Sequence, residues 1–139
     1  MLKIGVIGLG NIAQKAYLPV MAAMQDQYEF HLTTRNPEKR AQLATMYGFQ
    51  HTHATLEELM AVKPAAVFVH TPTDTHAAII KQLLLAGIHV YVDKPVATDL
   101  QVVQSLYDLA AARHLLLTCG FNRRFAPFNQ QLNAFPDKR

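Results

Sequence analysis

The stretch from Ile4 to Ala13 has the sequence IGVIGLGNIA, and it decides which folds the chain can adopt. Its first four residues are apolar or glycine, which is typical of a strand buried on both faces of a sheet. The glycine turn Gly8-Leu9-Gly10 follows at once, and a helix is expected from about Asn11. The stretch therefore fits the pattern G-x-G-x-x-A at the start of a strand-turn-helix unit, which is typical of dinucleotide-binding domains.

Each position of this pattern has a physical role in binding a dinucleotide. Gly8 allows the tight turn between strand and helix, Gly10 lets the backbone approach a pyrophosphate, and Ala13 keeps the helix close to the strand. The helix start, at Asn11 and Ile12, offers free N–H groups and the positive end of the helix dipole. We therefore predict a phosphate-binding loop that includes Gly8, Gly10, Asn11 and Ile12. A glycine turn without a ligand is the alternative.

Apolar runs alternate with helical patterns along the rest of the chain, which indicates β-α-β units and a parallel sheet. We expect strands at residues 4–7, 29–34, 49–51, 65–69, 88–92 and 115–118. We expect helices at residues 11–24 with a break at Pro19, at 36–47, from Thr55, at 74–87 with Asp74 as the cap, and at 99–113. Six strands with intervening helices predict an α/β fold with a doubly wound parallel sheet, the Rossmann architecture.

The six predicted strands are complete by about Gly120. We therefore assign residues 1–120 to one dinucleotide-binding domain. Residues 121–139 look like the start of a connection into a second, substrate-binding domain that is absent from this sequence, which suggests a fragment.

Composition and charge exclude several classes of protein. Half of the residues are apolar, which excludes a disordered chain, and the single cysteine, Cys119, excludes an internal disulfide framework. No apolar run reaches the roughly 18 residues of a membrane span, and no signal peptide precedes the first strand, so we expect a cytoplasmic protein. The net charge of +3 lies entirely in the last nineteen residues, so we expect no nucleic-acid surface.

The end of the second predicted strand bears on the choice of cofactor. NAD-preferring domains usually place an acidic residue there to hold the ribose 2′-hydroxyl, but residues 33–36 are Thr-Thr-Arg-Asn. Thr34 can donate a hydrogen bond to a 2′-phosphate, and Arg35 can pair with that phosphate or stack on the adenine. The stretch therefore favours NADP, or the use of both cofactors, over strict NAD, and the missing acid counts against a methyltransferase. A solvated Arg35 without a ligand is the alternative.

Three further segments give the chain a family resemblance. They are residues 70–76 (HTPTDTH), 93–95 (DKP) and 120–125 (GFNRRF). Together with the glycine turn, they resemble the N-terminal half of the Gfo/Idh/MocA oxidoreductases, and within that family the virulence-factor MviM-like branch. The resemblance implies NAD(P)-dependent hydride transfer on a sugar, cyclitol or related polyol by a protein that forms homo-oligomers.

The resemblance also implies roles for individual residues around the nicotinamide. Lys94 matches a lysine that orients the reacting hydroxyl and stabilises negative charge as its proton leaves, so it is the predicted catalytic residue. Pro95 matches a position that often follows a cis peptide bond. Asp93 stands where the family usually has Glu, so its contact with the cofactor ribose is expected to be longer or lost.

Other segments match cofactor contacts. By resemblance, the pyrophosphate and the nicotinamide ribose are lined by Thr71, Pro72 and Thr73. His76 matches a histidine at the start of the following helix, and a packing or capping histidine is the alternative. Asn122 and Arg123 match residues that border the nicotinamide pocket, and interdomain packing is the alternative for these two.

One element of the family's chemistry has no counterpart in this sequence. The family's second domain supplies a general acid/base histidine, and none of the other histidines here takes that place. No histidine has the neighbours of a metal site, so we predict no metal. We therefore expect this chain to bind the cofactor without catalysing a reaction. A non-catalytic NAD(P)-sensing regulatory protein of the same fold is the alternative.

Overall fold

The structure is a computed structural model that describes residues 1–121, 125–127, 129 and 131. Six parallel strands form one sheet in the order β3-β2-β1-β4-β5-β6. The strands are β1 (Leu2–Ile7), β2 (Tyr28–Thr33), β3 (His51–His53), β4 (Ala66–Val69), β5 (His89–Asp93) and β6 (Leu117–Gly120). The order reverses between β1 and β4, so the predicted doubly wound α/β sheet is confirmed.

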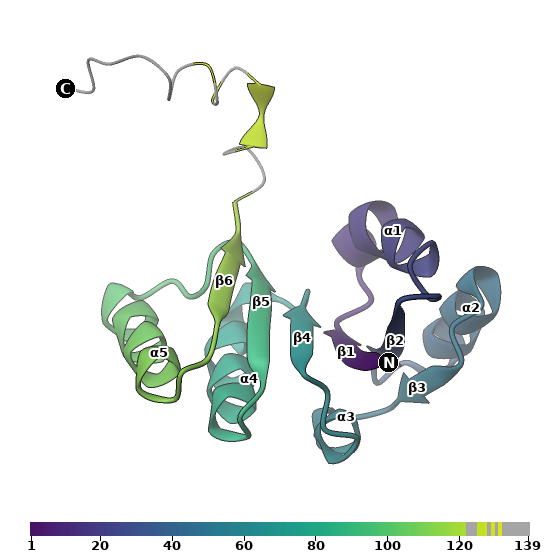
Figure 1. Cartoon of the computed structure of the whole chain (residues 1–139), viewed down its shortest axis with the longest axis horizontal. Helices are drawn as coiled ribbons and strands as arrows, with labels where there is room; N and C mark the ends of the chain where they lie inside the picture. The colour runs from purple at the N-terminus through teal and green to yellow at the C-terminus, as the bar shows by residue number, and fades with distance from the viewer. Residues whose placement is uncertain (122–124, 128, 130, 132–139) are drawn as a thin grey trace.

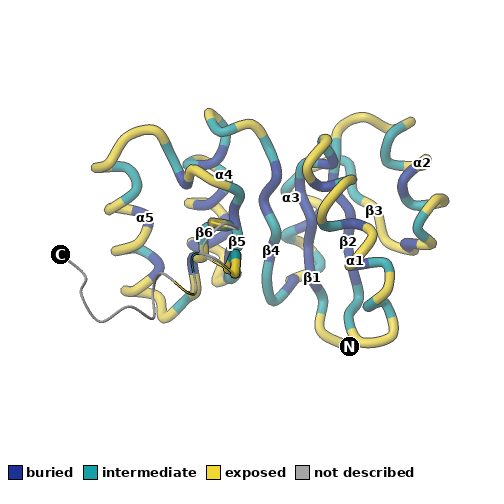
Figure 2. The backbone as a smooth tube through the Cα atoms, turned by 90° about the horizontal axis from the view of Figure 1, so that it is seen from above, coloured by how far each residue is buried: buried dark blue, intermediate teal, exposed yellow. Residues whose placement is uncertain are grey.

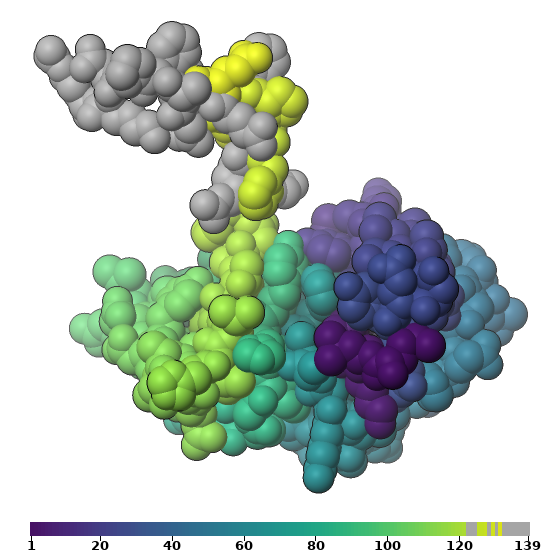
Figure 3. Space-filling view, in the orientation of Figure 1, coloured from purple at the N-terminus to yellow at the C-terminus, as the bar shows by residue number. Residues whose placement is uncertain are grey.

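Helices cover both faces of the sheet (Figure 1). They are η1 (Ala13–Tyr17), α1 (Leu18–Ala22), α2 (Pro37–Tyr47), α3 (Leu56–Ala61), α4 (Thr73–Leu85) and α5 (Leu100–Ala112). In Figure 2 the buried segments follow the strands, and the exposed segments follow the outer sides of the helices. The two halves of the chain lie at opposite ends of the long axis (Figure 3), as this strand order requires.

Alternating residues of the central strands build two separate cores. In β1, Ile4 and Val6 pack with α1 and α2, whereas Ile7 packs with α3, α4 and α5. In β4, Phe68 belongs to the first core and Val69 to the second. Because successive side chains of a strand point to opposite faces, one apolar run supplies both cores.

Local signals place several helix ends where the sequence predicts them. The side chains of Asn36, Thr55 and Asp99 accept hydrogen bonds from the backbone at the starts of α2, α3 and α5. Gly48 ends α2 in the left-handed conformation, with φ of 74°. These caps confirm the predicted boundaries.

The helix after the glycine turn differs from the prediction. We expected Pro19 to interrupt it, but the chain stays helical through residues 11–22, and the π-helical turn η1 leads directly into α1. The Leu18 N–H bonds to the Ala13 carbonyl, five residues back, and Pro19 lies in the first turn of α1. The local change of pitch lets the helix continue past the proline.

Three other boundaries were also predicted wrongly. Strand β3 begins at His51, because the Phe49 N–H bonds to the Ala44 carbonyl in the turn that ends α2. Strand β6 begins at Leu117, because His114 turns the chain with φ of 55°. Asp74 does not cap α4: the helix begins at Thr73, with Pro72 at the cap position and no side-chain cap.

Candidate functional site

The two glycines of the first turn are needed for different reasons. Gly8 has φ of 90°, and a Cβ atom there would lie 2.6 Å from the His70 carbonyl carbon and the Thr71 nitrogen. Gly8 therefore permits the close approach of the turn to the end of β4, besides the turn itself. A Cβ atom at Gly10 would meet nothing within 4 Å. The chain itself does not require a glycine there, so the open space is available to a ligand.

The helix start beside this space has the properties of an anion site. The Gln14 N–H is bonded to the Gly10 carbonyl, which places Asn11 and Ile12 in the first helical turn, and both are exposed. The first N–H groups of a helix have no intrahelical acceptor. They can therefore donate to a phosphate group that approaches Gly10.

A cavity of about 670 Å³ opens on the β2 side of the glycine turn, and we call it the β2 cavity. The predicted residues that line it are Gly8, Thr34, Arg35, Thr71 and Pro72. Sequence reasoning missed Thr33, which lines the same cavity and whose buried hydroxyl has no hydrogen-bond partner among the described residues. It also missed Arg40, whose Nη1 donates to the Thr34 carbonyl oxygen at 2.7 Å. Two acidic residues, Glu57 and Asp74, line the cavity as well.

A second cavity, of about 350 Å³, lies where β4 and β5 end, and we call it the β5 cavity. Its lining residues are Ile12, Tyr17, His70, Thr71, Thr73, His76, Asp93, Lys94 and Gly120. Thr71 lines both cavities, so they adjoin at the start of α4. The Lys94-Pro95 peptide bond is cis, as the resemblance implied. The structure therefore brings the residues from the ends of β1, β4 and β5 to one edge of the sheet, toward which β4, β5 and β6 point in Figure 1.

His76 is buried, and both of its ring nitrogens contact the chain itself. Nε2 lies 2.8 Å from the Thr71 carbonyl oxygen, and Nδ1 lies 2.8 Å from the Pro95 carbonyl oxygen. The imidazole thus ties the loop after β4 to the loop after β5. This geometry supports the packing alternative for His76, which positions the two loops.

A partly buried polar cluster, which was not predicted from the sequence, lies in the wall of the β5 cavity. Asp93 Oδ2 lies 2.8 Å from Nδ1 of His70, and its Oδ1 accepts a hydrogen bond from the Tyr17 hydroxyl at 3.1 Å. The Tyr17 hydroxyl also lies 2.9 Å from the Tyr91 hydroxyl. Burial raises the pKa of Tyr17 above its usual value, and the hydrogen bond with Tyr91 and the Asp93 charge act in the same direction. Tyr17 therefore stays protonated and donates to Asp93.

A sequence signal for this cluster existed. His70 and Asp93 each end an apolar run, and the carboxyl ends of parallel strands meet at one edge of the sheet. Because β4 and β5 are neighbours, their end residues come within hydrogen-bonding distance. The contribution of Tyr17 had no such signal, because it comes from the π-helical turn.

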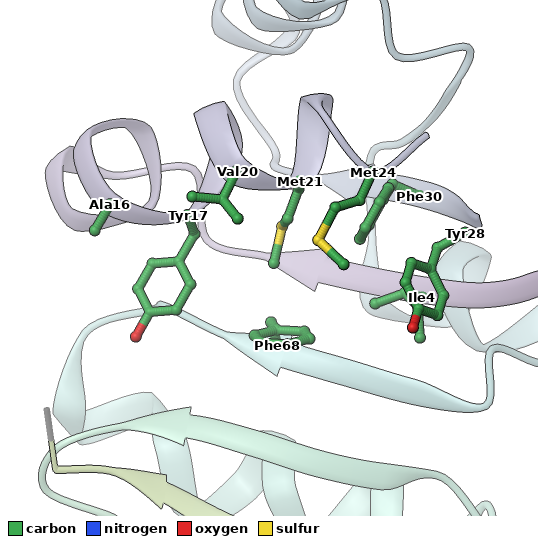
Figure 4. A pocket seen from close by; sticks show the side chains of 9 residues that line it. All are labelled: Ile4, Ala16, Tyr17, Val20, Met21, Met24, Tyr28, Phe30 and Phe68. Atoms are coloured by element: carbon green, nitrogen blue, oxygen red, sulfur yellow. The ribbon is translucent and has the colours of Figure 1, made fainter. Parts of the chain in front are cut away.

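An apolar groove of about 400 Å³ adjoins the cluster on the α1 side of the sheet (Figure 4). Met21 and Met24 of this groove face Phe68 across it, while the Tyr17 hydroxyl points away from the methionines. Tyr17 thus lines the groove and the β5 cavity at once. The groove offers few polar groups, so the chemistry of the site belongs to the two polar cavities.

The remaining predictions for the site concern absences and the end of the chain. Within the described residues, no group of three or more His, Cys, Asp or Glu side chains could hold a metal ion. No helix in that part of the chain is long and apolar enough to cross a membrane. Asn122 and Arg123 lie outside the described residues.

Comparison with known proteins places these features in context. The sequence model GFO_IDH_MocA, described as an oxidoreductase family with an NAD-binding Rossmann fold, matches residues 2–121. The chain is similar to UDP-N-acetylglucosamine 3-dehydrogenase of Acidithiobacillus ferrooxidans, with 32% identity over 94% of this chain and 40% of the relative.

Two solved structures are more similar in sequence. A Gfo/Idh/MocA family oxidoreductase from Vibrio cholerae has 43% identity and a TM-score of 0.88, over 96% of this chain and 43% of that one. The dehydrogenase MviM from Clostridium difficile has 42% identity and a TM-score of 0.86, over 94% of this chain and 43% of that one. The chain spans about two fifths of the length of these relatives.

Proposed function

The chain belongs to the Gfo/Idh/MocA family of oxidoreductases, and from this premise we propose that it forms the cofactor-binding half of an enzyme that oxidises or reduces a sugar-like substrate. The complete protein would transfer hydride between nicotinamide and a hydroxyl or carbonyl group of a sugar, cyclitol or related polyol. A relative that acts on UDP-N-acetylglucosamine supports this substrate class. The 139 residues alone would bind the cofactor and turn over no substrate.

One observation carries the cofactor assignment. The β2 and β5 cavities adjoin at Thr71, and the open space at Gly10 adjoins the free helix start. Each cavity is also lined by a residue with a buried polar atom that has no partner among the described residues. Those atoms are the Thr33 hydroxyl and His70 Nε2. A dinucleotide fits this arrangement, with adenosine in the β2 cavity, pyrophosphate at Gly10 and nicotinamide in the β5 cavity.

The chemistry of the site would divide between cofactor and protein. When bound, nicotinamide accepts or supplies the hydride. Lys94 is exposed and lines the β5 cavity, so its ammonium group can donate a hydrogen bond to the reacting substrate oxygen. A fixed positive charge there stabilises the negative charge that develops as the hydroxyl loses its proton. Thr73 and the loop held by His76 would shape the wall on which the nicotinamide rests.

We propose NADP as the preferred cofactor. Thr34 and Arg35 line the β2 cavity at the end of β2, and Arg40 adds a second positive charge beside Thr34. A 2′-phosphate would take hydrogen bonds from the Thr34 hydroxyl and the Arg35 guanidinium. Glu57 and Asp74 oppose this preference electrostatically, because they line the same cavity. Their opposition makes the preference for NADP modest.

Titration of the chain with NADPH and with NADH, followed by nicotinamide fluorescence, tests the proposal. We expect both to bind, with NADPH binding more tightly. Tighter binding of NADH would overturn the assignment of Thr34 and Arg35 to a 2′-phosphate. Binding of neither nucleotide by the folded chain would overturn the cofactor assignment as a whole.

A further inference from the structure

His70 directly follows strand β4, and its completely buried side chain has only one of its two nitrogens paired. Its Nδ1 lies 2.8 Å from Asp93 Oδ2, but its Nε2 has no hydrogen-bond partner among the described residues. An unpaired polar atom in a protein interior lowers the stability of the fold. An unpaired atom calls for an explanation, and in a side chain that lines a cavity a bound ligand can supply the missing partner.

Asp93 determines which nitrogen of His70 carries the proton. An ionised carboxylate only accepts hydrogen bonds, so the Nδ1–H of His70 donates to Oδ2. In the neutral imidazole, Nε2 is then an acceptor with a free lone pair. Both carboxylate oxygens of Asp93 already accept from His70 and Tyr17, so the acceptor of this cluster that lacks a donor is His70 Nε2.

The surroundings of His70 restrict which ligand group can pair with this nitrogen. The side chain lines the β5 cavity together with Thr71 and Lys94. A lone pair repels phosphate oxygens, which are themselves acceptors, so the partner must be a hydrogen-bond donor. The donors on a nicotinamide nucleoside are the ribose hydroxyls and the carboxamide NH₂ group.

We infer that His70 is a cofactor-positioning residue whose Nε2 accepts a hydrogen bond from the nicotinamide nucleoside, in the tautomer that Asp93 imposes. The inference rests on the proposed function. The ring of Tyr17 packs against the imidazole at a tilt of 40°, with 4.1 Å between the ring centroids, and Nε2 is buried. The inference therefore requires a side-chain movement that exposes the buried Nε2 when the nucleoside binds.

Substitution of His70 by Phe tests the inference, because it keeps an aromatic ring of similar size and removes the acceptor. The affinities to be measured are those for three ligands. NADH carries the whole nicotinamide nucleoside, ADP-ribose carries the second ribose without the nicotinamide, and ADP carries neither. We expect His70→Phe to weaken NADH binding about tenfold and to leave ADP binding unchanged. A parallel loss for ADP-ribose assigns the donor to the ribose, and its absence assigns the donor to the carboxamide.

Three further variants separate a specific contact from a general disturbance. His70→Gln keeps a donor for Asp93 and an acceptor for the ligand, so it is expected to retain most of the NADH affinity. In Asp93→Asn, the amide NH₂ of the asparagine can donate to Nδ1 of His70, which leaves the proton on Nε2. This variant is therefore expected to weaken NADH binding as much as His70→Phe does. His51→Phe, the same substitution on the exposed edge strand β3, is the matched control and should change no affinity.

The outcomes distinguish this inference from the proposed function. If the wild-type chain binds no NADH, both fail. If the wild-type chain binds NADH and His70→Phe binds it equally well, the inference alone fails. The inference alone also fails if His70→Phe loses as much affinity for ADP as for NADH. Should His70→Phe not fold, ¹⁵N NMR of the wild-type imidazole decides: we expect a protonated Nδ1 and an Nε2 signal that moves on addition of NADH, and an unmoved signal would overturn the inference.

Discussion

Nδ1 of His31 lies 2.9 Å from Nε2 of His53, and the two imidazole rings are stacked at an interplanar angle of 17°. The other nitrogen of His31 lies 2.8 Å from the Glu29 carboxylate. The chain of contacts from Glu29 through His31 to His53 needs one imidazole to accept from the other. It therefore tolerates one protonated imidazole and breaks when both are protonated.

We predict that this contact makes stability depend on pH below about 6.5. The pKa of His53 is lowered by burial and then by the charge of His31, while Glu58 acts in the opposite direction and His51 and Arg40 add to the lowering. Because the pKa of His53 in the folded state lies below its unfolded value of 6.5, its contribution is fully present above pH 6.5. The contribution is lost as the pH falls from 6.5 toward the folded pKa.

The measurement is the free energy of unfolding by urea between pH 7.5 and pH 5. His53→Asn should flatten the decrease that wild type shows over this range. His114→Asn is the matched control, since His114 is exposed and has a positive φ that asparagine tolerates. An unchanged slope in His53→Asn would show that the stacked pair does not carry the pH dependence. Glu29 adds a separate loss at lower pH, because the hydrogen bond with His31 lowers its pKa from 4.5.

Alanine at Gly8 and at Gly10 should separate folding from binding. Gly8→Ala forces a Cβ atom into the backbone of β4 at a positive φ, so we expect it to lower the free energy of unfolding by at least about 2 kcal/mol. Gly10→Ala adds a methyl group in open space, so the free energy of unfolding should change by less than about 0.5 kcal/mol. The same methyl group would obstruct the pyrophosphate, and NADPH affinity should fall at least about tenfold. Full NADPH affinity in Gly10→Ala would place the pyrophosphate elsewhere.

Alanine at Arg35 should affect NADPH selectively. The guanidinium is exposed and lines the β2 cavity, so its loss should weaken NADPH binding about tenfold through one charge-assisted hydrogen bond. NADH lacks the phosphate, and its affinity should change less than about twofold. Lys39→Ala, in the first turn of α2 and outside the cavity lining, is the control. Equal losses for both nucleotides would instead indicate stacking of Arg35 on adenine.

Lys94→Ala, made in the complete protein, tests the catalytic assignment. Removal of one donor to the developing oxyanion typically lowers kcat by about 10²–10³. The dissociation constant for the cofactor should stay within about threefold of wild type, because Lys94 is exposed and the contacts of the glycine turn and the β2 cavity are unchanged. Lys81→Ala, on the exposed side of α4, is the control. Unchanged turnover would favour the non-catalytic sensor.

The parts of the fold that the sequence predicts well are those encoded by local backbone requirements. Asn36, Gly48 and Asp99 each satisfy a helix cap that involves only neighbouring residues. The position of strand β3 was predicted two residues too early, because a three-residue edge strand of His-Thr-His has too little apolar periodicity to locate it. The π-helical turn was not predicted, because a proline such as Pro19 indicates a break in a helix and carries no information about the helix pitch.

The candidate site shows the same division. The glycine turn, Thr71 and Lys94 could be identified from motifs, and they lie together at one edge of the sheet. The cluster of Tyr17, His70 and Asp93 depends on side chains from three elements, up to 76 residues apart in the sequence. Contacts between such distant residues follow from the tertiary arrangement, which no single segment encodes.

The strand order has a consequence for how the domain responds to its ligand. Residues from β1 to α3 supply much of the β2 cavity, while those from η1 and from β4 to β6 supply the β5 cavity. A molecule that occupies both cavities is held only when the two halves of the sheet stand side by side. Such a ligand therefore links the two halves reversibly across the boundary between β1 and β4. Hydrogen exchange of the backbone amides that pair these two strands should become slower as more of the protein is bound to ligand.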